Sequence, residues 1–271
     1  MKRFFLLLSG CLSIAALQAQ IKQGTIIYER KTDMHRMIQD DQMRAMIPQF
    51  RSSKHMLLFS DSVSVYKAVP EDEAPDPFAG GGGVRMVFRG GGSDGGDLYK
   101  NFAQAKSVQA NELAGKNYLI VDTIKQQPWK LGTETQTILG HTCHKATRKL
   151  TQAGGGMMRT ISMNGNGSQR ADSSRPQTKE VDVVAWYADD IISPVGPDSH
   201  GQLPGVILQL DIDNGGTVFT ATEIKPTVDQ KELKEPKKGK LVTRQEYMKI
   251  QSDLMSSQLQ GMPGGVRFRM N

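Results

Sequence analysis

Three side chains that could bind a metal ion or react lie close together in the sequence: His141, Cys143 and His144. Thiolate and imidazole groups are good ligands for zinc and copper. In a β-strand His141 and Cys143 would share one face and His144 would lie on the other, because side chains alternate along a strand. The three could bind one metal ion only if the chain bends there. A structural role for Cys143 therefore stands beside two alternatives, a copper or zinc site and a redox role.

Other patterns typical of enzymes are absent from the sequence. It has no H-E-x-x-H metalloprotease motif, no G-x-S-x-G nucleophile motif and no G-x-x-x-x-G-K-[ST] phosphate-binding loop. The carboxylates at 71–73 and 189–190 are adjacent, and such groups are more often solvated than catalytic. His200 follows Asp198 and Ser199, but neighbours in sequence do not make a catalytic triad. We predict a protein that is not an enzyme and that holds no cofactor.

The N-terminus has the layout of a secretion signal. Lys2 and Arg3 precede an apolar run over 4–17, and Ala19 offers a small residue for cleavage. The run is shorter than the roughly 20 apolar residues of a membrane-spanning helix, and no later run approaches that length. We expect residues 1–19 to be removed and the mature chain to be exported, without a transmembrane segment, to the periplasm or the outer membrane.

Cys11 offers an alternative, in which the protein is a lipoprotein anchored through this residue. Small residues precede it, but the mature chain would then begin with the apolar stretch 12–17, where a polar tether is usual. Without the anchor, Cys143 is the only thiol of the mature chain in an oxidising compartment, so no intramolecular disulfide can form. Cys143 must then be buried, bound to something or paired with another molecule.

The length and charge exclude few functions. The chain has 271 residues, enough for one sizeable domain after signal removal. Its formal net charge of +6 falls to +4 when Lys2 and Arg3 leave, since each carries one positive charge. The remaining positive charge is spread along the chain, and we predict no nucleic-acid partner.

Short stretches rich in β-branched and aromatic residues predict a β-dominated domain. The predicted strands are at 24–30, 55–60, 62–68, 106–112, 117–123, 135–150 with a break at 140, 180–187, 205–213 and 217–224. Methionines at helical spacing predict a helix with a core-facing stripe over 33–47, and a capping box at 243–246 predicts a terminal helix. We predict a mainly β fold: a single antiparallel, strongly curved sheet or open barrel with a helix near each end.

Composition divides the rest of the chain. Glycine, proline and serine dominate 70–97 and 153–178, which we interpret as mobile insertions in a β-rich domain over 20–260. Residues 225–240 are rich in lysine and proline and are expected to wrap the surface. Residues 261–271 are expected to form a flexible tail.

Residues 201–208 have the sequence GQLPGVIL, which resembles the motif of the GLPGLI family of secreted bacterial proteins. The stretch 138–146, ILGHTCHKA, is similar to the family's Gly-Tyr-x-Cys-x-Lys-Ala segment. Ala185-Trp186-Tyr187 and Trp129 also fit the family's order of motifs. The chain departs from the family in Gln202, in Val206 for leucine and in His141 for tyrosine. The resemblance covers 105–225 and implies an exported envelope protein, but the family supplies no settled biochemical activity.

From these observations we predict a non-catalytic binding or accessory module. Its partner would be a small apolar or peptide ligand or an outer-membrane protein, and its candidate contact residues are Trp186, Tyr187, Leu203, Pro204 and Gly205. A purely structural turn at Leu203-Pro204-Gly205 is the alternative for the last three residues. The alternative function is a soft-metal protein that binds copper or zinc through Cys143 with histidine or methionine.

Overall fold

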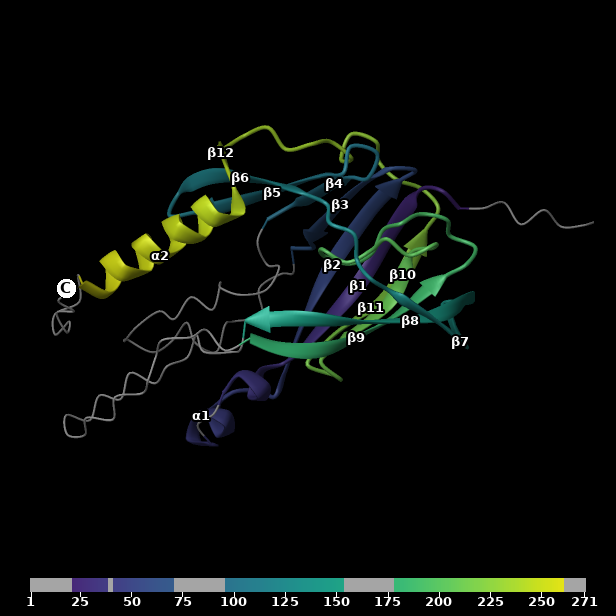
Figure 1. Ribbon diagram of the computed structural model, residues 1–271, viewed down its shortest axis with the longest axis horizontal. Coiled ribbons are helices and arrows are strands. Elements are labelled where there is room, and N and C mark those ends of the chain that lie inside the picture. Colours follow the sequence, from purple (N-terminus) through teal and green to yellow (C-terminus); the bar gives the residue numbers. More distant parts are fainter. Residues whose placement is uncertain (1–20, 39–40, 71–95, 154–177, 261–271) are drawn as a thin grey trace, which may run out of the picture.

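The computed structural model describes residues 21–38, 41–70, 96–153 and 178–260 (Figure 1). The predicted signal peptide and tail, and nearly all of the two glycine-rich insertions, lie outside the described residues. The described chain forms one 12-stranded sheet in the order β12-β6-β5-β4-β3-β2-β1-β11-β10-β9-β8-β7. The strands are β1 Gly24–Asp33, β2 Phe50–Ser60, β3 Val63–Ala68, β4 Leu98–Asn101, β5 Lys106–Leu113, β6 Lys116–Thr123, β7 Lys130–Ile138, β8 His141–Ala153, β9 Thr178–Ala188, β10 Ile207–Ile212, β11 Thr217–Lys225 and β12 Lys240–Val242.

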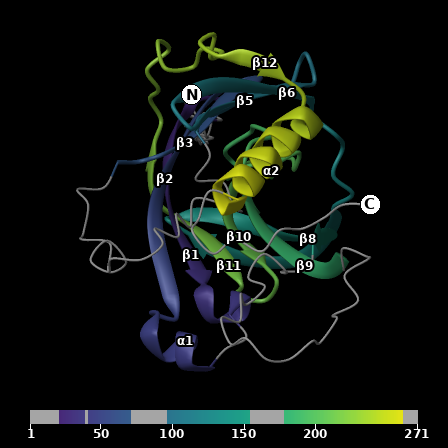
Figure 2. The same cartoon turned by 90° about the vertical axis from the view of Figure 1, so that its left-hand side faces the viewer.

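The sheet is open, with β12 at one edge and β7 at the other. Neighbouring strands of the described sheet pair antiparallel except β12, which runs parallel to β6. Figure 2 shows the sheet curving from β12 and β6 through β2 to β8 and β9, with α2 in front of its concave side. The predicted mainly β fold with a single large sheet is confirmed, but the sheet does not close into a barrel.

The core lies on the concave face of the central strands. The register places Ile26 of β1 opposite Leu57 of β2, and Phe219 of β11 opposite Leu210 of β10. These four side chains are almost fully buried. Alternation along each strand sends every second residue to this face, so the paired strands bury one continuous apolar layer.

The segment between β11 and β12 covers a second apolar cluster. Val228 and Leu233 pack against a cluster that includes Leu58, Val65 and Val108. Ion pairs tie the same segment to the sheet: Lys67–Glu232 at 2.8 Å and Lys106–Glu235 at 2.6 Å. The predicted surface wrap over 225–240 therefore covers strands β2 to β6.

The predicted terminal helix is α2, Arg244–Gln260. Its capping box is formed: the Thr243 N–H donates to Glu246 Oε2 at 2.7 Å, and the Glu246 N–H donates to Thr243 Oγ1 at 3.2 Å. Tyr247 is buried against Tyr118 of β6, with ring centroids 5.6 Å apart. No helix in the described parts of the chain is long and apolar enough to cross a membrane.

The predicted helix over 33–47 forms only in part. A 3₁₀ turn covers Met34–Met37 and a short helix, α1, covers Asp41–Met46. Ile38 interrupts them in an extended conformation and is buried, so the core takes this residue where helical spacing would place a methionine stripe. Met46 is 79% exposed, which contradicts the predicted core-facing stripe at that position. The two pieces must also return the chain from β1 to the adjacent β2, which leaves no room for one long helix.

Candidate functional site

Cys143 lies in β8 and is completely buried. Its Sγ lies 3.6 Å from the backbone oxygen of His141. Burial raises the pKa of the Cys143 thiol to about 11. The group is therefore a neutral thiol near pH 7, and a neutral thiol is neither a strong nucleophile nor a good metal ligand.

The two histidines beside Cys143 are paired with aspartates. His141 Nδ1 lies 2.7 Å from Asp190 Oδ2, and His144 Nε2 lies 3.3 Å from Asp189 Oδ2. In the described parts of the chain, no three histidine, cysteine, aspartate or glutamate side chains are arranged to hold a metal ion. The structure therefore does not bring together the proposed copper or zinc ligands His141, Cys143 and His144.

The GLPGLI-like segment forms a tightly packed turn before β10. A Cβ added at Gly205 would overlap the carbonyl oxygen of Ala188 at the end of β9. The close approach is held by backbone bonds, from Ala188 N–H to Val206 O at 2.9 Å and from Val206 N–H to Ile191 O at 3.0 Å. Only glycine permits this contact between two backbone segments.

A buried polar cluster holds the turn against the sheet. Lys100 of β4 is 3% exposed and donates from Nζ to the backbone oxygens of Asp198 and His200 at 2.8 and 3.0 Å. Arg148 Nη2 of β8 lies 2.9 Å from His200 Nδ1, and the Trp129 indole N–H donates to Gly201 O at 2.8 Å. The sequence patterns did not identify Lys100 or Arg148, because they lie far from the motif along the chain.

Burial in this cluster shifts the pKa values of Lys100 and His200. Burial lowers the pKa of Lys100 to about 8. Burial, together with the positive charges of Arg148 and Lys100, lowers the pKa of His200 to about 3. Since arginine is always a donor, His200 accepts at Nδ1 and is neutral over most of the pH range. The cluster joins β4 and β8 to the motif turn.

The five predicted contact residues do not line one pocket. Leu203, Gly205 and Tyr187 are buried, Trp186 is half-buried and Pro204 is exposed. Trp186 and Tyr187 are consecutive in β9, so their side chains lie on opposite faces of the sheet. None of the five lines the groove described below. Their part in ligand binding stays a prediction.

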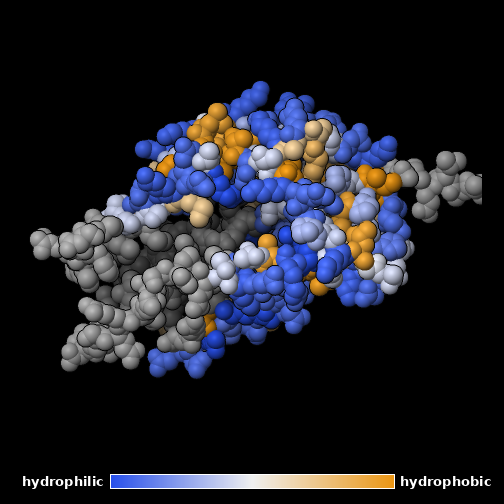
Figure 3. Space-filling model, viewed as in Figure 1, coloured by the Kyte–Doolittle hydropathy of each residue, from blue (hydrophilic) through white to orange (hydrophobic). Residues whose placement is uncertain are grey.

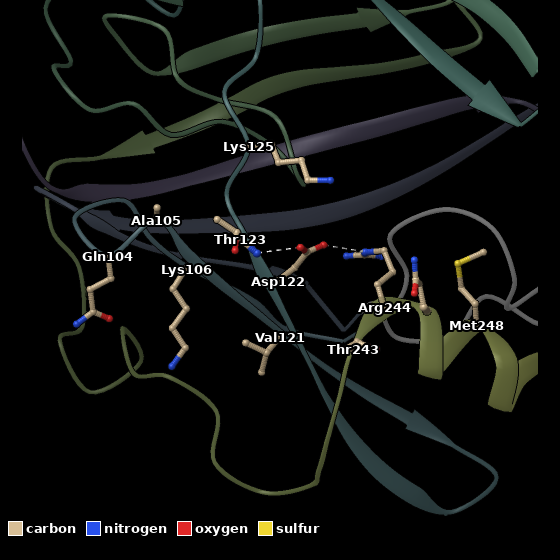
Figure 4. Close-up of a pocket in the computed structure, with 11 residues that line it drawn as sticks. Gln104, Ala105, Lys106, Val121, Asp122, Thr123, Lys125, Thr243, Arg244 and Met248 are labelled. Carbon is tan, nitrogen blue, oxygen red and sulfur yellow. Dashed lines mark hydrogen bonds and ion pairs between the residues drawn. The ribbon is translucent and has the colours of Figure 1, made fainter.

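An open groove lies where the end of β6 meets the start of α2 (Figure 4). Its volume is about 750 Å³. Cationic, polar and apolar side chains share its lining: Gln104, Ala105, Lys106, Val121, Asp122, Thr123, Lys125, Thr243, Arg244, Gln245 and Met248. The aliphatic stems of the cationic residues give such a groove apolar walls below charged ends.

The charges at the groove are partly paired. Asp122 accepts from the Thr123 N–H at 2.8 Å and lies 3.4 Å from Arg244 Nε. Lys106 pairs with Glu235. Lys125 is exposed, and in Figure 4 its side chain extends away from the ribbon. The lining thus contains three cationic residues, Lys106, Lys125 and Arg244, and one carboxylate, that of Asp122.

The described chain is thus a mainly β protein with one open, curved sheet and a surface groove beside β6. Residues 129–209 match a family model described as "Protein of unknown function (Porph_ging)". The matched model is that of the GLPGLI family. The match confirms the family resemblance over residues 129–209. The comparison with curated protein sequences gives no match.

Solved structures share parts of the fold. Two crystal forms of PNGF-II align with a TM-score of 0.50 and 14% identity over 84% of this chain. The present chain spans about a third of PNGF-II, 32% in the C2 form and 33% in the P21 form. LprF from Mycobacterium bovis aligns with a TM-score of 0.27 and 9% identity, over 81% of this chain and 90% of LprF. The likeness to PNGF-II concerns the fold alone.

Proposed function

We propose that this protein is a non-catalytic binding module of the bacterial cell envelope that holds a polypeptide in the groove between β6 and α2. The groove is the observation that carries the proposal. Its volume of about 750 Å³ lies within the range of ligand pockets, roughly 300–1,000 Å³. It is open along one side, as a site for a chain segment must be, whereas a small apolar molecule is usually enclosed.

The lining of the groove supports binding over catalysis. Its one carboxylate, Asp122, is engaged by the Thr123 N–H and by Arg244. Outside the groove, Cys143 is a buried neutral thiol and His200 is a buried neutral imidazole held by Arg148. The motif turn, Lys100 and Arg148 then serve to hold the sheet in shape.

The character of the surface supports a polypeptide partner over an apolar one. Figure 3 shows a face that is mainly hydrophilic, with apolar residues in separate patches. Stable docking of an apolar surface usually uses one continuous patch. The envelope location rests on the predicted signal peptide and on the family resemblance. The partner is then a secreted peptide or a segment of an outer-membrane protein.

Native mass spectrometry of the protein purified from its own envelope tests the proposal. Met248 lines the groove and is 62% exposed, so Met248→Trp should narrow the groove without disturbing the core. Met46 on α1 is 79% exposed and does not line the groove, so Met46→Trp is the matched control. We expect a retained polypeptide on the wild type and on Met46→Trp, and its loss from Met248→Trp. No retained polypeptide, or equal retention by all three chains, would contradict the proposal.

A further inference from the structure

The groove follows a stretch of sheet edge that no described strand covers. Strand β12 pairs with β6 only over Tyr118–Ile120, whereas β6 continues to Thr123. The chain leaves the sheet after Val242 because the capping box at Thr243 starts α2. The last three residues of β6 therefore form a short edge beside the groove, in line with β12.

The backbone groups at this edge can be assigned from the neighbouring bonds. The Ile124 N–H donates to Ala105 O at 2.8 Å, so residue 124 directs its backbone groups toward β5. In an antiparallel pair these directions alternate along the strand. Val121 and Thr123 therefore direct their backbone groups away from β5, toward the groove. The Thr123 N–H is taken by the Asp122 side chain, which caps the edge in the absence of a partner.

The charges around the edge are complementary to an acidic partner. Lys125 follows β6 directly, and Arg244 begins α2 on the other wall of the groove. Arg244 is half-exposed and meets Asp122 through Nε at 3.4 Å, a long contact for an ion pair. A carboxylate that enters the groove would find Lys125 and Arg244 within the same cavity.

We infer that the groove takes an extended, acidic stretch of a partner polypeptide, which adds as a strand to the edge of β6 at Val121–Thr123 and places a carboxylate against Lys125 and Arg244. The inference rests on the proposed function and names its ligand class. Main-chain hydrogen bonds to the sheet edge supply affinity in this mode, and the charged side chains supply specificity. On binding, the partner's backbone would replace the Asp122 cap.

Fluorescence anisotropy with short labelled peptides tests the inference on the mature chain. The first peptide alternates threonine with aspartate. The second carries asparagine in place of aspartate, and the third is the acidic peptide with proline in place of threonine, which removes the N–H groups that a strand needs. We expect the first peptide to bind about tenfold tighter than either of the others.

Variants of the groove locate the binding. Lys125→Glu and Arg244→Glu should each weaken binding of the acidic peptide about fivefold, since each replaces an attraction by a repulsion. Lys54→Glu reverses an exposed charge on β2, which three strands separate from β6, and should leave binding unchanged. Thermal unfolding confirms that each variant is folded.

The outcomes separate this inference from the proposed function. Equal binding of the acidic and asparagine peptides, equal binding of the proline peptide, or no effect of Lys125→Glu would overturn the inference. If none of the three peptides binds, the inference also fails. The proposed function fails only if the envelope-purified chain retains no polypeptide, or retains it equally after Met248→Trp.

Discussion

Single residues at the motif turn decide how closely two backbone segments approach. Gly205 touches the carbonyl of Ala188 where any side chain would overlap it. Leu203 is buried and Pro204 is exposed. The turn therefore places the Leu203 side chain in the core and leaves Pro204 in solvent. The turn then delivers Val206, Ile207 and Leu208 to fully buried positions.

Gly205→Ala should destabilise the fold by about 2 kcal/mol or more, because either the turn or the end of β9 must move. Gly215→Ala is the comparison. Gly215 has a φ of +87° with open space around it, so alanine there meets conformational strain alone, about 1 kcal/mol. Urea unfolding of the two variants measures both values. A smaller loss for Gly205→Ala than for Gly215→Ala would show that the close approach is not rigid.

Cys143 should be inaccessible in the native protein, because its side chain has no exposed surface. Thiol reagents are expected to label it slowly before denaturation and rapidly afterwards. Cys143→Ala should lower the free energy of unfolding by about 1 kcal/mol or more through the lost packing, and it should leave any bound metal unchanged. Rapid native labelling that zinc or Cu(I) blocks would instead restore the metal hypothesis, with His141 and His144 as the next residues to change.

His200 should make the fold sensitive to acid. Its folded pKa of about 3 lies below the ordinary 6.5. Between these two pH values the imidazole is therefore protonated in the unfolded chain and neutral in the folded chain. Stability is therefore fully present above pH 6.5 and falls as the pH drops from 6.5 toward 3. His200→Gln keeps an acceptor for Arg148 without this proton, and the difference in unfolding free energy between pH 7 and pH 4 should shrink. His35→Gln, outside the cluster, is the control, and an unchanged difference for His200→Gln would contradict this assignment.

The sequence indicated the role of single residues better than it indicated contacts between distant segments. Cys143 was expected to be structural, and its burial agrees with that expectation. Lys100, Arg148 and the groove residues were not identified, because their function comes from contacts between segments far apart in the chain. Arg244 and Asp122, for example, are 122 positions apart. Nothing in local composition marks such pairs.

At the scale of elements, alternating patterns identified the longer strands and missed the two shortest. Strand β4, Leu98–Asn101, has only four residues and β12, Lys240–Val242, has only three, so their patterns are too short to stand out. The helix expected over 33–47 failed for the opposite reason. Its spacing was regular, but the need to join β1 directly to β2 outweighed local helical preference.

The capping box of α2 should affect both stability and binding. Thr243 caps the helix, directly follows β12 and lines the groove. Thr243→Ala should cost about 1 kcal/mol of stability and should weaken binding of the acidic peptide. Thr133→Ala, at an exposed threonine of the edge strand β7, is a control that removes the same groups without a cap. If the two variants unfold at the same temperature, the cap contributes nothing measurable.

At the scale of the whole molecule, the segment after β11 covers one face of the sheet, whereas the end of β6 has no described neighbour strand on one side. The segment after β11 covers strands β2 to β6 and is bound to the sheet by ion pairs with Lys67 and Lys106. β12 then covers only part of the β6 edge. The groove lies beside this part of the β6 edge, which no described strand covers.

Ile21, the first residue that the structure describes, lies two positions after the predicted cleavage site at Ala19. Ile21 forms a bridge with Ile191, with its N–H donating to Asp190 O at 3.2 Å and its carbonyl accepting from the Ile192 N–H at 3.0 Å. A cleavage site beyond Ile21 would remove this bridge, whereas cleavage after Ala19 leaves it intact. Intact-mass analysis of the exported chain should therefore show a start at or near Gln20 without lipid. A chain that begins with a diacylated Cys11 would show that the protein is held on the membrane, with residues 12–20 as the tether between the lipid and the bridge at Ile21.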